Sequence, residues 1–144
     1  ATSDMTWAKD RIGKIRIREA YAYKSLMDQN GMIAFGSDFP VESINPLEGL
    51  FSAVARTDHA GYPFEGGFQS ENAVERGQAI KAMTIWAAYA NFEEQTRGSL
   101  EKGKSADMVI FDTDIEFCEV KEIISAKVLR TMIEGEWVYI AENE

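Results

Sequence analysis

The sequence predicts an α/β segment followed by a mostly β segment, and the change falls near residue 95. A helical run over 16–29 leads through a tight turn into a short apolar run over 32–35, which is the order of elements in an α/β unit. Strand-like apolar runs replace the helical spacing in the last third of the chain. The predicted fold class is therefore α/β then β.

The α/β unit is predicted from the spacing of apolar residues and from the residues that end each element. Apolar side chains recur at helical spacing over 16–29, and Asn30-Gly31 provides a left-handed stop. The residues 32–35 form a continuous apolar run that ends in Gly36-Ser37-Asp38. Such a run is typical of a strand that is buried on both faces.

Two further helical regions flank a long loop. Pro46 is suited to the first turn of a helix that runs to Arg56, and helical spacing returns over 79–89 as one helix or a pair. Between them, 57–72 is rich in glycine and aromatic residues, which predicts a surface loop. Loops of this length in a compact domain often serve as lids or binding loops.

The mostly β segment is predicted from apolar runs separated by polar residues and glycine. Residues 120–125 are compatible with a single helical turn, and Glu134-Gly135-Glu136 is a turn suited to a hairpin. The predicted strands cover 98–100, 108–111, 128–133 and 137–140.

Composition narrows the class of partners. The net charge of -9 would repel nucleic acid and anionic lipid surfaces, and no apolar run approaches the roughly 20 residues of a membrane span. One cysteine, Cys118, cannot form an intramolecular disulfide, so a reducing cytoplasm is the expected location. The chain starts without Met at Ala1-Thr2-Ser3-Asp4, and we expect it to be part of a longer protein.

Asp38 is the strongest candidate for a catalytic or metal-binding residue. It follows the predicted buried strand, and loops at the C-terminal ends of strands in α/β folds are where active sites collect. A carboxylate in that position can bind a metal or take a proton. The alternative is that Asp38 only caps a turn through backbone N–H groups, and the local sequence leaves both interpretations open.

The other reactive residue types give weaker signals. A hydrolytic zinc site usually takes three protein ligands, and His59 is the single histidine of the chain. Because His59 lies in the glycine-rich loop, we expect it to be exposed or packed against the loop. Cys118 is expected to fill space in the core.

Several motifs in a fixed order resemble the amidohydrolase superfamily, and specifically amidohydrolase family 3, a branch of predicted metal-dependent hydrolases. Gly36-Ser37-Asp38-Phe39-Pro40-Val41-Glu42 is similar to the segment that ends the last barrel strand. The segments Ala1–Met5, Asn45-Pro46-Leu47, 84–90 and 98–110 resemble the family in the same order, so the resemblance covers nearly the whole chain.

The resemblance implies the C-terminal part of a (β/α)8 TIM-like barrel, with residues 1–94 as its end and 95–144 as strands of a small β sandwich. It also implies a metal-dependent hydrolase of C–N bonds in non-peptide amides or cyclic amides. In that family a divalent metal, zinc by preference, activates a water. Asp38 resembles the aspartate that contacts the metal and shuttles the proton of this water.

The remaining metal ligands of the family lie upstream of the matched motifs, so we expect the isolated chain to be inactive. As substrate-binding neighbours of Asp38 we place Ser37, Phe39 and Glu42, with Asp4 and Trp7 from the preceding barrel loop; Glu42 could equally be a surface carboxylate. The expected partners are a small-molecule substrate and either a second copy or the missing N-terminal part. The alternative function is a non-catalytic binding or assembly module.

Overall fold

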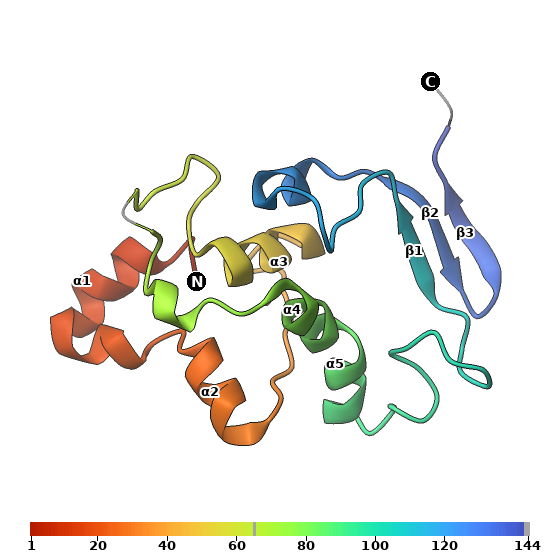
Figure 1. Cartoon of the computed structure of the whole chain (residues 1–144), viewed down its shortest axis with the longest axis horizontal. Helices are drawn as coiled ribbons and strands as arrows, with labels where there is room; N and C mark the ends of the chain where they lie inside the picture. Colours follow the sequence, from red (N-terminus) through yellow and green to blue (C-terminus); the bar gives the residue numbers. More distant parts are fainter. Residues whose placement is uncertain (65, 143–144) are drawn as a thin grey trace.

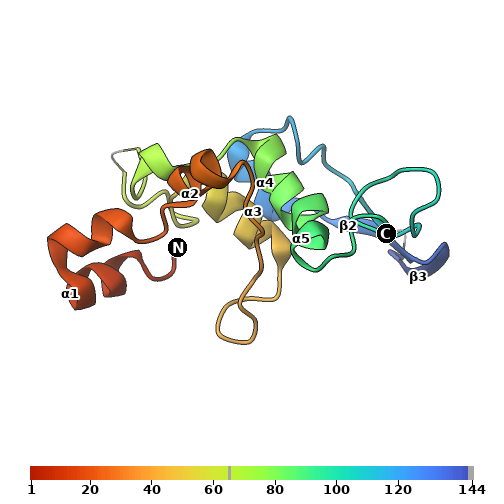
Figure 2. The same cartoon turned by 90° about the horizontal axis from the view of Figure 1, so that it is seen from below.

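The computed structural model describes residues 1–64 and 66–142 and consists of helices followed by a small sheet (Figure 1). The elements in order are α1 (Met5–Arg16), η1 (Ile17–Glu19), α2 (Tyr23–Asn30), α3 (Pro46–Ala55), η2 (Ser70–Asn72), α4 (Arg76–Met83), α5 (Ile85–Ala90), β1 (Met108–Phe111), η3 (Val120–Ser125), β2 (Val128–Ile133) and β3 (Glu136–Ile140). The sheet lies at the opposite end of the molecule from α1 in both views (Figure 2). The predicted change to β structure in the last third of the chain is confirmed, whereas the described residues before it form helices without the predicted strand.

The core lies among the helices. We call residues 1–90 together with 115–126 the helical body. Its central side chains come from α2, α3, α4, η3 and the link before α4, and they are Met27, Leu47, Leu50, Phe51, Ala53, Val74, Ala79 and Ile123. Ile123 is fully buried in this core. The 115–126 segment, which follows β1 in the sequence, therefore completes the core. The charged side chain of Arg76 on α4 holds the same segment by donating to the carbonyl oxygens of Glu116 and Cys118.

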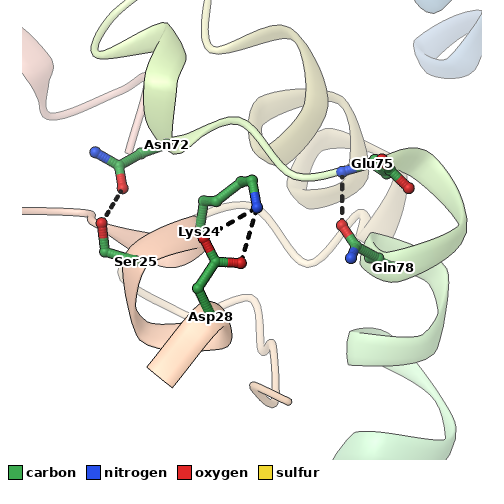
Figure 3. A network of polar contacts seen from close by, with 6 residues as sticks. All are labelled: Lys24, Ser25, Asp28, Asn72, Glu75 and Gln78. Carbon is green, nitrogen blue, oxygen red and sulfur yellow. Dashed lines mark hydrogen bonds and ion pairs between the residues drawn. The ribbon is translucent and has the colours of Figure 1, made fainter. Parts of the chain in front are cut away.

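Local capping explains where α3 and α4 begin. The Asn45 side chain accepts a hydrogen bond of 3.1 Å from the backbone N–H of Leu47, and Pro46 occupies the first turn as predicted. At α4 the backbone N–H of Glu75 donates to Gln78 at 3.2 Å, which closes a capping box (Figure 3). Short sequence signals therefore determine both helix starts.

The predicted helix over 16–29 is divided in the structure. Tyr21 has a φ of 55° and Ala20 is extended, so the chain turns between η1 and α2. The predicted end is confirmed, since Gly31 adopts a left-handed conformation with φ of 77°. Helix α1 was not predicted, and Gly13 interrupts it with a φ of 78°.

Contacts between side chains fix α2 against its neighbours. Ser25 donates to Asn72 of η2 at 3.2 Å, and Asn72 is almost fully buried (Figure 3). On the exposed face of α2, Lys24 and Asp28 form an ion pair at 2.8 Å. The Ser25–Asn72 hydrogen bond joins distant parts of the chain, whereas the Lys24–Asp28 ion pair links two residues one helical turn apart on the surface.

The predicted buried strand over 32–35 is wrong for this chain as the structure describes it. These residues are neither helix nor strand, Ala34 is exposed, and the other three are half-buried. Among the described residues, the N–H of Phe35 links this segment to another part of the backbone by donating to the carbonyl oxygen of Ala82 at 2.9 Å. A parallel strand requires hydrogen-bonded neighbours on its edges, and the described residues supply none at this position.

The sheet is antiparallel with the order β1-β2-β3, and each pairing contains one irregularity in register. The predicted strands over 108–111, 128–133 and 137–140 are confirmed, as is the helical turn, which is η3. The predicted strand over 98–100 is wrong, because Gly98 turns with a φ of 90° against α5. Every residue of β3 is exposed.

Cys118 is half-buried and packs against the core of the helical body, which confirms its predicted role as a core filler. No helix within 1–64 and 66–142 has the length and apolar character to cross a membrane.

Candidate functional site

Asp38 lies at an exposed turn that follows the 32–35 segment. Its φ of 61° is left-handed, and its backbone oxygen accepts from the N–H groups of Val41 at 2.9 Å and Glu42 at 3.3 Å. The hydroxyl of Ser37 accepts from the N–H of Phe39 at 3.2 Å and supports the same turn. The backbone of Asp38, not its side chain, therefore makes the turn, and the carboxylate is exposed to solvent.

A cleft of about 910 Å³ lies beside this turn. It reaches Ser37 and Glu42 on either side of Asp38, while Asp38 and Phe39 lie outside its lining. Its walls come from the first three residues, from 33–37, from the start of α3 and from 58–60 of the long loop. Segments that are far apart in the sequence thus meet next to the Gly-Ser-Asp turn.

Two hydrogen bonds tie the N-terminal segment to this region. The hydroxyl of Ser3 donates to Glu42 at 2.6 Å, and the hydroxyl of Tyr21 donates to Asp4 at 3.1 Å. Burial, and then the hydrogen bond to the Asp4 carboxylate, raises the pKa of Tyr21 to about 12. In this structure Glu42 and Asp4 therefore act as hydrogen-bond acceptors that hold the N-terminal segment in place: Glu42 accepts from Ser3, and Asp4 accepts from Tyr21.

The two aromatic candidates lie away from the cleft lining. Phe39 is 59% exposed on the turn. Trp7 projects from α1 with 61% of its surface exposed, and the guanidinium of Arg11 stacks over its ring at 5.5 Å. Of the predicted neighbours of Asp38, only Ser37 and Glu42 line the cleft.

His59 and Asp58 line the cleft, and the sequence interpretation did not place them there. His59 is exposed and its ring packs edge-on against Phe51 at 5.6 Å, as expected for a loop-packing histidine. Asp58 makes a local turn by accepting from the N–H groups of Ala60 at 2.9 Å and Tyr62 at 2.8 Å. The Asp-x-Ala-Gly pattern at 58–61 was the available signal for this turn.

Arg56 anchors the base of the long loop. Its side chain is fully buried, with Cζ over the rings of Tyr23 at 5.2 Å and Phe68 at 5.5 Å. Its Nε donates to the carbonyl oxygen of Phe68 at 2.9 Å, and burial lowers the pKa of the guanidinium. The loop is thus fixed at both ends while 58–60 faces the cleft.

The residues present do not form a metal site by themselves. No group of three or more His, Cys, Asp or Glu side chains converges anywhere in 1–64 and 66–142. Asp38 is one carboxylate at an exposed turn, whereas a catalytic zinc takes about three protein ligands. No catalytic step through a metal is derived from this chain.

Comparison with known proteins identifies the family. The model of the amidohydrolase family matches residues 1–139, which is nearly the whole sequence. The chain therefore belongs to the amidohydrolase family, and the resemblance of its motifs is confirmed.

Individual relatives agree with this assignment. The chain is 31% identical to the putative amidohydrolase YtcJ of Bacillus subtilis, over 95% of this chain and 26% of that protein. It is 32% identical to the N-substituted formamide deformylase of Arthrobacter pascens, over 80% and 20%. It is 39% identical to Protein LONG AFTER FAR-RED 3 of Arabidopsis thaliana, over 85% and 20%. The chain thus spans about a fifth to a quarter of the length of these relatives.

Proposed function

We propose that this chain supplies a proton-carrying carboxylate, Asp38, to a hydrolase that cleaves C–N bonds of non-peptide amides or cyclic amides. The single observation that carries the proposal is the match of the amidohydrolase family to residues 1–139, which includes the Gly36-Ser37-Asp38 turn. The similarity to an N-substituted formamide deformylase makes small N-substituted amides the first substrates to test. Ser37 and Glu42, which line the adjacent cleft, would contact the substrate.

The reaction in this proposal is hydrolysis. The oxygen of water bonds to the carbonyl carbon, the C–N bond breaks, and the proton of the water moves through the Asp38 carboxylate to the leaving nitrogen. A divalent metal, zinc by preference, would be held in part by Asp38 and would supply Lewis acidity toward the water and the carbonyl. The other ligands of this metal would lie outside this sequence, so we expect the isolated chain to be inactive. We also propose a cytoplasmic location for the full-length hydrolase.

The same proposal gives the two parts of the chain different structural roles. Residues 1–94 would close the last units of a TIM-like barrel, and 95–144 would belong to a β sandwich. The unpaired backbone of the 32–35 segment supports the first role, because neighbouring barrel strands would form hydrogen bonds with it. The exposed apolar side chains of β3 support the second, because another layer would cover them. The partner in both cases would be the remaining part of the same protein.

Replacement of Asp38 in the full-length protein tests the catalytic role. We expect Asp38→Asn and Asp38→Ala to lower kcat by roughly 10²–10⁴-fold on N-formyl amines, because the proton carrier is lost. Asp28→Asn is the matched control, since Asp28 is exposed and pairs only with Lys24 on α2. Metal content of each variant is measured alongside turnover. Turnover of metal-loaded Asp38→Ala within a few-fold of the wild type would remove Asp38 from the mechanism.

A second candidate function is a non-catalytic binding or assembly module. The observation that favours it is the exposure of large apolar residues on the sheet, including Trp137, Val138 and Ile140. Sedimentation of the 144-residue chain tests this candidate: a stable compact monomer would contradict the module.

A further inference from the structure

The cleft has an uneven distribution of charge. Its lining includes the carboxylates of Glu42, Glu48 and Asp58, and no lysine or arginine side chain of the described residues takes part. Arg56, the buried cation at the C-terminal cap of α3, is covered by aromatic rings and is not part of the lining.

Hydrogen bonds hold two of the three carboxylates in place. Glu42 accepts from Ser3 at 2.6 Å, and Asp58 accepts from two backbone N–H groups of its own loop. Both side chains are half-buried, as is Glu48 in the first turn of α3. Fixed, partly buried charges of one sign give a cleft a field that acts on a ligand at short range.

Several apolar side chains also line the cleft. Ile33 and Phe35 come from the segment before the Gly-Ser-Asp turn, and Ile44 and Met83 lie on the other sides. A ligand in this cleft would therefore bury an apolar portion and would meet carboxylates around it. Such a surface suits a neutral or cationic group on an apolar chain and disfavours a carboxylate.

We propose that the cleft selects amides whose N-substituent is apolar and neutral or cationic, and that it excludes anionic substrates, with Asp58 and Glu48 as specificity-determining residues. This rests on the proposed function, because it takes the cleft beside Asp38 as the place where the substrate binds. It goes beyond that function by naming the charge of the substrate. Nothing in the Gly-Ser-Asp motif itself requires this selectivity.

The test compares three formamides of nearly equal size on the full-length protein. Their N-substituents are n-propyl, 2-ammonioethyl and carboxymethyl, so that they differ in charge. We expect kcat/KM for the ammonium compound to exceed that for the carboxylate by at least tenfold at low ionic strength, and the ratio to shrink as salt is added. A ratio of one or less would overturn the proposal.

Variants identify the source of the discrimination. Asp58→Asn keeps an oxygen that can accept the two loop hydrogen bonds while the charge is removed, and Glu48→Gln is similarly conservative. We expect each to reduce the ammonium-to-carboxylate ratio roughly three- to fivefold. Asp28→Asn removes a charge on the exposed face of α2, outside the cleft lining, and should leave the ratio unchanged. Equal effects of all three variants would contradict the assignment of specificity to the cleft.

The two proposals fail in different ways. Absence of turnover on all three compounds by metal-loaded protein would refute the proposed hydrolysis. In that case titration calorimetry with the same compounds still measures the charge preference, as a difference in binding affinity. Tighter binding of the carboxylate compound than of the ammonium compound would overturn the charge selectivity even where hydrolysis is observed.

Discussion

The helical body and the three-stranded sheet bury their apolar residues to very different extents. The buried apolar side chains of the described residues all lie in the helical body, and Leu50 is only 1% exposed. In the sheet, Val138 is 58% exposed, and apolar residues of all three strands are open to solvent. Yet the sheet is paired in antiparallel fashion along both ladders, with one irregularity in register in each.

This difference separates two sources of order. Helices α2 to α4 and η3 are held by side chains that exclude water from a common core. The sheet is held by backbone hydrogen bonds and a hairpin, and it lacks a second layer among the described residues. The helical body is therefore the part with a buried apolar core, whereas the sheet leaves large apolar side chains exposed to solvent.

The largest expected effect comes from the core. In the 144-residue chain, Leu50→Ala should lower the free energy of unfolding by about 2–5 kcal/mol, because it leaves a cavity among buried neighbours. Val138→Ala in β3 should change it by no more than roughly 0.5 kcal/mol. Urea unfolding followed by circular dichroism measures both. A comparable loss for the two variants would mean that the sheet is already covered, for example by self-association.

Two glycines between α5 and β1 extend the comparison, because Gly98 is closely packed and Gly103 is not. A Cβ at Gly98 would lie 2.7 Å from the Cβ of Ala88 and 3.0 Å from the Cα of Ile85. Gly103 has a similar positive φ, but open space surrounds it. Gly98→Ala should therefore cost roughly 1–3 kcal/mol more than Gly103→Ala, which carries only the backbone strain of about 1–2 kcal/mol. Equal losses in thermal unfolding would show that the close approach to α5 is absent.

The smallest effect is expected from Tyr21 at alkaline pH. Its pKa is about 12 in the folded chain and about 10 when unfolded, so the folded state holds the proton more tightly. The stability due to this group is fully present below pH 10 and is lost as the pH rises toward 12. Tyr21→Phe should remove this loss, and Asp4→Asn should move it to lower pH. Phenolate absorbance and unfolding measured together over this range test it; an unchanged profile in Tyr21→Phe would contradict the assignment.

Part of the fold follows directly from local sequence. The start of α3 at Asn45-Pro46, the stop of α2 at Gly31 and the hairpin between β2 and β3 were predicted because each depends on neighbouring residues. The split between η1 and α2 was missed, since apolar spacing over 16–29 continues through a break at Tyr21. Periodicity records which face is apolar and does not record a single backbone turn.

The sequence by itself determined the family, through motifs in a fixed order, and it singled out Asp38 at the end of the 32–35 run as the candidate carboxylate. Only the tertiary structure decided that 32–35 stays unpaired in this chain and that Asp58 meets Glu42 at one cleft. The physical reason is the range of the interactions. Caps and turns form between residues a few positions apart, whereas a strand needs hydrogen-bonding neighbours and a cleft needs walls from segments that only folding brings together.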